Sequence, residues 1–595
     1  MKTTTLLLAG LLAAKLGVMA QGVDALAPSS VTPKAYRPGG AAAPSSTTQP
    51  HSPRTADGDK PLIAGMTIKG IVVVKSQAEI KPGGSSQKGV MVQDIPFLSG
   101  TDFWRMLERH LGKPLTENAI RAIQDGIILY CREHGKLLVD VILTEQNIEN
   151  GVLQLWWLEG KVDKIAVRNE GTHWFRNRLI MGQMRLRSGD SVDSQKLTED
   201  LNWINNNPFR QVDVAFKQGG KTEATPAGKI GLTDVELTVE DRFPVRPYIG
   251  YENSGTRFTG VDRFLAGLNW GNAFGLDHQF NYQYATDANF DLVKAHSASY
   301  LIPLPWRHTL LLYGSYVDGK ADFSSIGDPT TAEGTSWQAS IRYGLRLPSV
   351  NQLRHEVSAG FDFKRGDNSL FFGGIPSPTG AETDVAQFSV SYSGLLPDKC
   401  GRTSFGVEMY FSPGDLSVHN DDESYDELRK GTESTYFYAR LNAERVTRLP
   451  YDFIWSVKAW AQVASERLLP SEQLALGGWN TIRGYDERVV LGDHGWIISN
   501  ELRTPPWNIG NILEREGGQD TLQFLAFFDY GAVRIQDQVP DDGEDPEKSL
   551  YSVGGGLRYS VSRNFSFRLD YGWALAERDL NERNGRVHAA ALLSF

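Results

Sequence analysis

An arginine set among glycines and aromatic residues is the feature of this sequence that most suggests a dedicated site. Arg483 lies in the stretch LGGWNTIRGYDE, residues 476–487. An arginine stays charged and offers five donors in a rigid planar fork. If it is buried it needs a carboxylate partner, because an unpaired charge at low dielectric is costly. The surrounding region alternates apolar and polar residues, so the stretch indicates a channel rather than an enzyme.

Residues that could perform catalysis are scattered through the sequence. The serines and histidines considered as a hydrolytic set, as in a barrel lipase, show neither triad spacing nor a nucleophile elbow. They are Ser404, Ser499, His296, His308, His355 and His588. The sequence has no Cys/His spacing typical of a metal site and no phosphate-binding loop. We therefore predict no enzyme, no cofactor and no metal.

Length, charge and cysteine content limit the class further. A chain of 595 residues exceeds one hydrophobic core, so at least two domains are expected. The net charge of -10 and the lack of a Lys/Arg cluster exclude nucleic acid as a partner. Cys131 and Cys400 fall in different predicted domains, so no disulfide is expected even in an oxidising compartment. Cys131 lies on the apolar side of a predicted helix, as a small core residue does.

The N-terminus has the composition of a targeting segment followed by a spacer. A lysine precedes the apolar run 6–19, which is shorter than the roughly 18 apolar residues of a membrane span. We interpret residues 1–20 as a signal peptide cleaved before Gln21, with a second possible site after Ala27. Residues 21–60 are rich in Pro, Ser, Thr, Gly and Ala without apolar periodicity, which predicts a flexible linker.

Residues 61–240 alternate strand and helix patterns twice. The strand patterns cover 68–74, 137–143, 152–158, 162–167, 212–216 and 232–239. Thr116 can cap a first helix whose apolar face carries Ile120, Ile123, Ile127 and Cys131 and which Gly135 can end. A second helix carries Leu197, Leu201 and Ile204 and stops at Pro208. Two small α/β modules, 61–160 and 161–240, are the simplest account.

Residues 241–595 predict a transmembrane β-barrel of about sixteen antiparallel strands. Segments of about ten residues alternate apolar with polar or small side chains, as strands between lipid and water do. They cover 245–253, 259–270, 277–285, 293–302, 307–317, 335–347, 353–364, 382–395, 402–412, 433–447, 452–464, 494–503, 521–533, 550–560, 563–574 and 586–595. An even number permits closure, which removes unpaired backbone groups from hydrocarbon. A soluble propeller would repeat a blade signature, and none is present.

Several motifs in these regions carry a family resemblance. Tyr130, His134 and Glu159-Gly160 are similar to the first periplasmic POTRA module of two-partner secretion transporters (TpsB proteins), and the run NNNP at 205–208 resembles the second. Residues 462–485 resemble the long loop of these transporters and of their relatives BamA and TamA, and FFDYG at 527–531 resembles the second superfamily signature. The chain is thereby identified as a TpsB-type protein, similar to the ShlB/FhaC/HecB haemolysin secretion/activation proteins. The resemblance covers nearly everything after residue 61.

The resemblance implies a site inside the barrel. In the family the long loop, here 465–493, folds into the lumen with the arginine at its tip. The implied pair is Arg483 with Asp529, and an apolar aromatic run is a poor place for an unpaired carboxylate. We predict that this pair latches the loop to the barrel wall. The accompanying motif residues are Gly477, Gly478, Ile482, Gly484 and Tyr485 in the loop and Phe527 and Gly531 on the strand.

The resemblance also implies a function and partners. It predicts a Gram-negative outer-membrane translocator whose POTRA modules capture an unfolded secreted partner (TpsA-like) in the periplasm for export, and possible activation, through the pore. Outer-membrane lipid, periplasmic chaperones and the barrel assembly machinery are further implied partners, with Phe595 as the terminal aromatic read during assembly. Many members carry a pore-plugging helix, but residues 21–60 contain no amphipathic helix for that purpose. A barrel-assembly factor with more modules, or a simple porin without modules, are the alternatives.

Overall fold

The computed structural model describes residues 59–63, 65–220, 231–256, 259–322, 331–367, 382–512, 520–540, 544–577, 580 and 584–595. These residues form two compact units, one with 206–209 and 243–595, the other with 59–205 and 210–242. The predicted signal peptide and all but the last two residues of the predicted linker lie outside the described residues. Among the described helices, none has the length and apolar character needed to cross a membrane.

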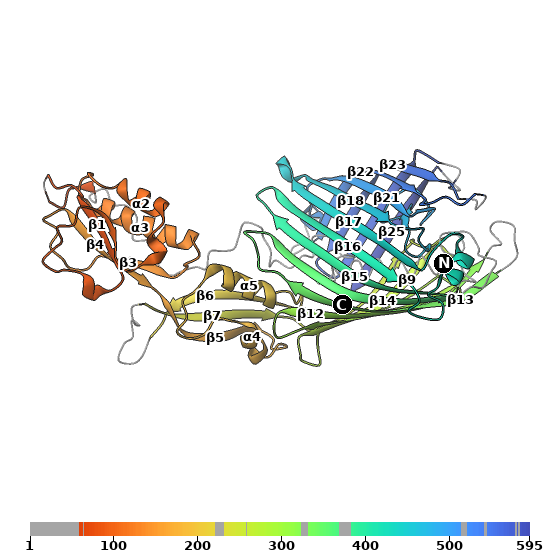
Figure 1. Cartoon of the computed structure of the whole chain (residues 1–595), viewed down its shortest axis with the longest axis horizontal. Helices are drawn as coiled ribbons and strands as arrows, with labels where there is room; N and C mark the ends of the chain where they lie inside the picture. The colour runs from red at the N-terminus through yellow and green to blue at the C-terminus, as the bar shows by residue number, and fades with distance from the viewer. Residues whose placement is uncertain are drawn as a thin grey trace. The chain divides into compact units, whose positions relative to one another are not determined.

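The first α/β module is a four-stranded sheet in the order β2-β1-β4-β3 with two helices packed on it (Figure 1). Its elements are β1 (Gly70–Val74), β2 (Gly89–Val92), α2 (Thr101–Glu108), α3 (Glu117–Glu133), β3 (Val139–Ile142) and β4 (Val152–Glu159). Strand β1 is paired on both sides, and all five of its residues are buried, which explains its unbroken apolar sequence. The sequence analysis missed β2 and α2, since each is too short to establish a period.

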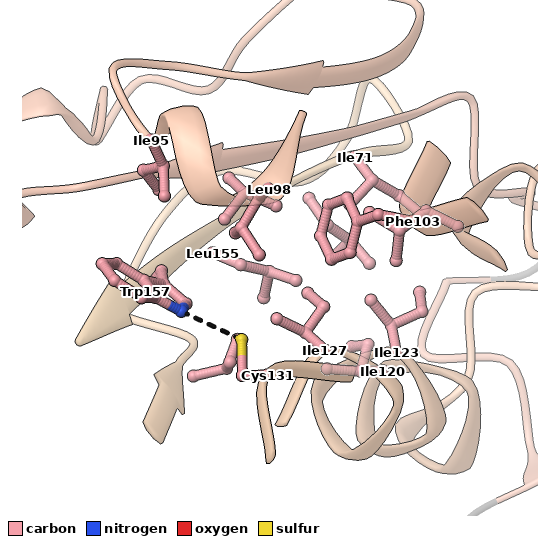
Figure 2. Close-up of a cluster of buried hydrophobic side chains, with 14 of the residues drawn as sticks. Ile71, Ile95, Leu98, Phe103, Ile120, Ile123, Ile127, Cys131, Leu155 and Trp157 are labelled. Carbon is pink, nitrogen blue, oxygen red and sulfur yellow. Dashed lines mark hydrogen bonds between the residues drawn. The ribbon is translucent and has the colours of Figure 1, made fainter. Parts of the chain in front are cut away.

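Helix α3 begins and ends where its sequence indicates. The Thr116 hydroxyl accepts a hydrogen bond from the amide of Ala119 at 3.0 Å, and Gly135 follows the helix with φ of 92°. Its buried face packs against the sheet, as Figure 2 shows, with the Trp157 indole donating to the Cys131 sulfur at 3.4 Å. Cys131 is buried, Cys400 is exposed, and both are free thiols.

The second module is a three-stranded sheet in the order β5-β7-β6. Its elements are β5 (Lys161–Gly171), α4 (Asn177–Gln183), α5 (Ser194–Ile204), β6 (Arg210–Gln218) and β7 (Leu232–Asp241). Helix α5 ends at Ile204, earlier than the predicted stop at Pro208. The side chain of Asn205 explains the difference, since it donates to the Val212 carbonyl at 2.9 Å and accepts from the Val212 amide at 2.7 Å. These bonds fix the turn into β6.

The rest of the chain forms a closed antiparallel barrel of sixteen strands, which confirms the predicted number (Figure 1). The strands are β8 (Val245–Glu252), β9 (Arg263–Ala273), β10 (His278–Thr286), β11 (Val293–Pro303), β12 (His308–Asp322), β13 (Thr331–Arg346), β14 (Arg354–Asp367), β15 (Glu382–Pro397), β16 (Gly401–Pro413), β17 (Thr435–Arg448), β18 (Ile454–Ala464), β21 (His494–Arg503), β22 (Asp520–Arg534), β23 (Glu547–Val561), β24 (Phe565–Ala574) and β25 (Gly585–Ser594). Each is paired with the next, and β25 closes on β8 from Ala590 opposite Glu252 to Ser594 opposite Tyr248.

Several strand starts differ from the predicted segments: β13 begins at Thr331 instead of 335 and β23 at Glu547 instead of 550. For β9 the structure shows a local reason. The second segment was expected from residue 259, whereas β9 begins at Arg263. The buried Arg263 guanidinium donates to the carbonyls of Thr259 and Gly260 at 3.1 and 2.8 Å, which holds those residues in a turn. The predicted segment therefore began too early, because residues 259 and 260 belong to the turn that Arg263 holds.

Strand β22 shows how the wall separates two environments. Phe524 and Phe528 are exposed, whereas Phe527 and Asp529, on either side of Phe528, are buried. Because successive side chains of a strand point to opposite faces, the exposed apolar set belongs to the outer surface and the buried set to the lumen. Carboxylates such as Asp529 thus lie inside a wall whose outside is apolar.

Candidate lumen site

The segment between β18 and β21, residues 465–493, is folded and buried within the barrel unit. It contains a short hairpin of β19 (Leu474–Leu476) and β20 (Val490–Gly492), which the sequence analysis did not predict. Ile482 and Tyr485 near its tip are fully buried. Their apolar neighbours include Ile497 on β21 and Val533 on β22. The segment therefore occupies the lumen against that part of the wall.

Arg483 and Asp529 form a two-pronged ion pair. The arginine Nε and Nη2 donate to Asp529 Oδ2 and Oδ1 at 2.8 and 2.9 Å, and the Arg483 amide also donates to Oδ2 at 3.2 Å. The arginine side chain is 4% exposed and the aspartate side chain fully buried. The structure thus brings together the two residues that the sequence analysis paired.

The arginine has additional partners that the sequence analysis did not assign to it. Its Nη1 donates to Glu501 on β21 at 2.9 Å, and Asp570 on β24 lies 3.6 Å from the same nitrogen. The Phe527 ring of the strand motif lies 3.5 Å below the guanidinium carbon, in cation–π geometry. The sequence did contain an indication that Asp570 belongs to this site, because Asp570 interrupts an apolar strand pattern as Asp529 does.

Two residues weighed above as hydrolytic candidates belong to this network instead. The Ser499 hydroxyl donates to Asp529 Oδ1 at 2.6 Å. His588 Nε2 accepts a hydrogen bond from the Gly484 amide at 3.1 Å. The Ser499 hydroxyl thus helps to fix Asp529 on the wall, and the His588 imidazole helps to hold the loop.

The motif glycines explain how the loop tip approaches the wall. Gly484 has φ of 93°, and a Cβ there would lie 2.8 Å from the Gly572 backbone of β24. A Cβ on Gly531 would lie 2.9 Å from the Leu476 side chain and 3.2 Å from that of Ile482. Gly477 also has a left-handed φ, of 97°. Glycine therefore lets the loop and two wall strands come into direct contact.

The remaining loop-motif residues contribute to the conformation and the contacts of the loop. Gly478, with φ of 100°, precedes Trp479, whose amide donates to Glu487 at 2.7 Å. The Tyr485 hydroxyl donates to the Ala576 carbonyl at 2.6 Å, just beyond the end of β24.

At the C-terminus of the chain, Phe595 is 67% exposed and its amide donates to the Pro247 carbonyl at 3.1 Å.

Both ends of the loop are tied near the start of β21. Asp493 is fully buried and accepts hydrogen bonds from the Leu468 amide and from the Gln473 side chain, at 2.9 and 3.0 Å. Arg429, which follows α6 (Asp422–Leu428), donates to Asp493 at 2.8 Å and to Glu544 at 2.8 Å. Three loops therefore meet at one buried carboxylate.

These arrangements tie the loop to the barrel wall through charged groups. In the described part of the chain, no cluster of three or more His, Cys, Asp or Glu is arranged to hold a metal ion. A closed sixteen-strand barrel that holds its own long loop in the lumen, with two α/β modules before it, defines the class of an outer-membrane protein translocator.

Comparison with known proteins places the chain in a family. The model of the haemolysin secretion/activation protein family ShlB/FhaC/HecB matches residues 231–559, more than half of the sequence, and the chain belongs to this family. Outer membrane transporter CdiB of Dickeya dadantii is 24% identical over 75% of this chain and 74% of its own. Hemolysin transporter protein ShlB of Serratia marcescens is 23% identical over 85% of each chain.

A solved structure supports the fold. CdiB from Escherichia coli superposes with a TM-score of 0.68 at 18% identity, covering 92% of this chain and 93% of that one. At this identity the likeness concerns the architecture alone. It spans the barrel and the α/β modules, because so little of either chain is left uncovered.

Proposed function

We propose that this translocator captures an unfolded secreted partner protein, of the TpsA type, in the periplasm and exports it through the barrel. The Arg483–Asp529 pair would latch the loop within the lumen between export events. The observation that carries this proposal is the buried loop tip, where Arg483 contacts Asp529 and Glu501 on two adjacent wall strands. No nucleotide is available at the outer membrane, so folding of the partner outside would draw the exported chain forward.

Capture is proposed to occur at the edge of the first module, which resembles a POTRA module. Among the described strands, β2 pairs with β1 alone, so its other edge can accept an extended peptide through main-chain hydrogen bonds. Helix α2 packs beside this strand. Main-chain recognition tolerates many side chains, as a long unfolded partner requires.

Deleting residues 61–160 tests the capture role. Export of the partner should be lost while the barrel still inserts, measured by partner in the medium and by heat-modifiable migration of the barrel. The full-length protein should bind an unfolded N-terminal piece of the partner with weak salt dependence, because main-chain bonds dominate. Undiminished export by the deletion variant would disprove the role. Recognition of Phe595 by the assembly machinery and escort by periplasmic chaperones belong to the same proposal.

A further inference from the structure

A second charged contact holds the same lumen loop at another place. The Glu472 side chain is 1% exposed and accepts hydrogen bonds from the Lys364 ammonium at 2.7 and 3.0 Å. It also accepts from the Tyr438 hydroxyl at 2.7 Å and the Gln387 amide at 3.2 Å. The Arg440 guanidinium donates to its backbone carbonyl at 2.7 Å. Glu472 lies in the LPSEQ run of the loop, residues 469–473. The Arg483–Asp529 latch does not involve this run.

The two contacts lie on different arcs of the wall. Lys364 is on β14, Gln387 on β15 and Tyr438 on β17. Arg483 contacts β21, β22 and β24, which are separated from that arc by β18. The loop therefore bridges two sectors of the barrel and is held at each by its own charges.

The two contacts differ in the geometry and exposure of their ion pairs. Arg483 binds Asp529 through two parallel hydrogen bonds, contacts Glu501 as well and stacks on a ring. Bidentate guanidinium pairs are strong and directional, whereas a lysine acts as a point charge. The Glu472 carboxylate has Lys364 as its ion-pair partner, and that side chain is 14% exposed. Separating Glu472 from the wall therefore breaks one ion pair with a point charge that water can reach. It also breaks the hydrogen bonds from Tyr438, Gln387 and Arg440.

We propose that Glu472 is the releasable clamp of the lumen loop. When the Glu472–Lys364 pair separates, the loop near residue 471 leaves β14 and β17 while the Arg483 end stays on β22. The passage for the partner then opens along the β14–β17 arc. This inference rests on the proposed export function, but it concerns the loop of the protein alone.

Thiol accessibility can distinguish the two ends of the loop. In a Cys400→Ser background, Pro470→Cys reports on the clamp end and Thr481→Cys on the latch end, both at partly buried positions. Ser471 is left unchanged, because its hydroxyl donates to Glu472 at 2.9 Å. Each reporter is combined with Glu472→Gln, with Lys364→Met, and with Glu444→Gln as a matched control on β17, where Glu444 pairs with Lys458 at 3.7 Å. The full-length protein is reconstituted in lipid, and the rate of modification by a small cationic methanethiosulfonate is measured.

Glu472→Gln and Lys364→Met should each raise modification at position 470 by about tenfold and at position 481 by less than about twofold, because only one end opens locally. The double variant should equal the single ones, and Glu444→Gln should change neither rate. An equal rise at both positions, no rise in variants with normal heat-modifiable migration, or additive effects would each overturn the clamp. Because no secreted partner is needed, failure here leaves the export proposal standing, and failure of export leaves the clamp intact.

Discussion

The interior of the first α/β module and the interior of the barrel differ in the polarity of their side chains. The module core is apolar and includes Phe103, Ile127 and Leu155. The lumen site is charged, with Arg483 against buried carboxylates. The difference follows from the surroundings of each fold. A module in water hides its apolar side chains inside, whereas a barrel in lipid turns them outward and leaves its interior to polar groups.

The two interiors therefore respond differently to change. Apolar burial is non-directional and roughly proportional to area, so a core loses stability gradually as atoms are removed. A buried ion pair depends on both partners, because either one alone is left as an uncompensated charge. We therefore expect a loop held by such pairs to be either attached or released, as the proposed latch requires.

The largest effect is expected from breaking the latch. Arg483→Ala removes the arginine that pairs with Asp529, while Glu501 keeps its pair with Arg503. Asp529→Ala leaves Arg483 paired with Glu501, so the first change should be the more damaging. Each should destabilise the seated loop by up to about 3 to 5 kcal/mol, less where water enters. Export should collapse while the barrel still inserts. The measurements are secretion, heat-modifiable migration and protection of the loop from protease.

A double-mutant cycle separates this pairing from independent roles. Arg483→Ala with Asp529→Ala should show a coupling of about 0.5 to 3 kcal/mol in loop protection. Strict additivity would refute the pairing even if Arg483 proved essential for another reason. The charged groups of the lumen would then contribute additively, and the proposed difference between the charged lumen and the apolar core would be wrong.

The next largest effect is expected in the apolar core. Ile127 is fully buried on α3, so Ile127→Ala should destabilise the first module by about 2 to 5 kcal/mol and Ile127→Val by about 0.5 to 1.5 kcal/mol. Urea-dependent proteolysis of the module in the full-length protein would measure this. The barrel's heat-modifiable transition should not move. A shift of that transition as large as the module's would show that the two interiors are one cooperative unit.

The sequence predicted the barrel better than it predicted the site. Sixteen strands were recoverable because a period of two is enforced by lipid on one face of every segment. The partners of Arg483 were only partly recoverable: Asp529 stood out in an aromatic run, but Glu501 lies beside charged Arg503 and gave no contrast. The clamp at Glu472 depends on Lys364, which is 108 residues away. No local pattern encodes such a pairing, nor the short hairpin β19–β20.

A smaller effect on stability is expected at the outer surface. Phe595 is 67% exposed and lies beyond the last residue of β25, so its removal takes few contacts from the fold. Deleting it should impair insertion in cells, since the terminal aromatic is proposed to be read during assembly. Refolding into detergent should stay close to normal. Comparable losses in both assays would mean that Phe595 stabilises the fold by packing. An exposed residue of the outer surface would then contribute to stability as a buried residue does.

The smallest perturbation compares the two cysteines. Burial in the apolar core of the module raises the pKa of the Cys131 thiol to about 11, whereas Cys400 is exposed at the turn between β15 and β16. At pH 8 only about one in a thousand Cys131 thiols would be the reactive thiolate. Iodoacetamide should therefore label Cys400 and leave Cys131 until urea opens the module. Ile127→Ala should speed Cys131 labelling, because it lowers the cost of opening the core, and Arg483→Ala should not. Equal acceleration by both variants would show that the charged lumen and the apolar core are coupled, and the contrast between them would have to be abandoned.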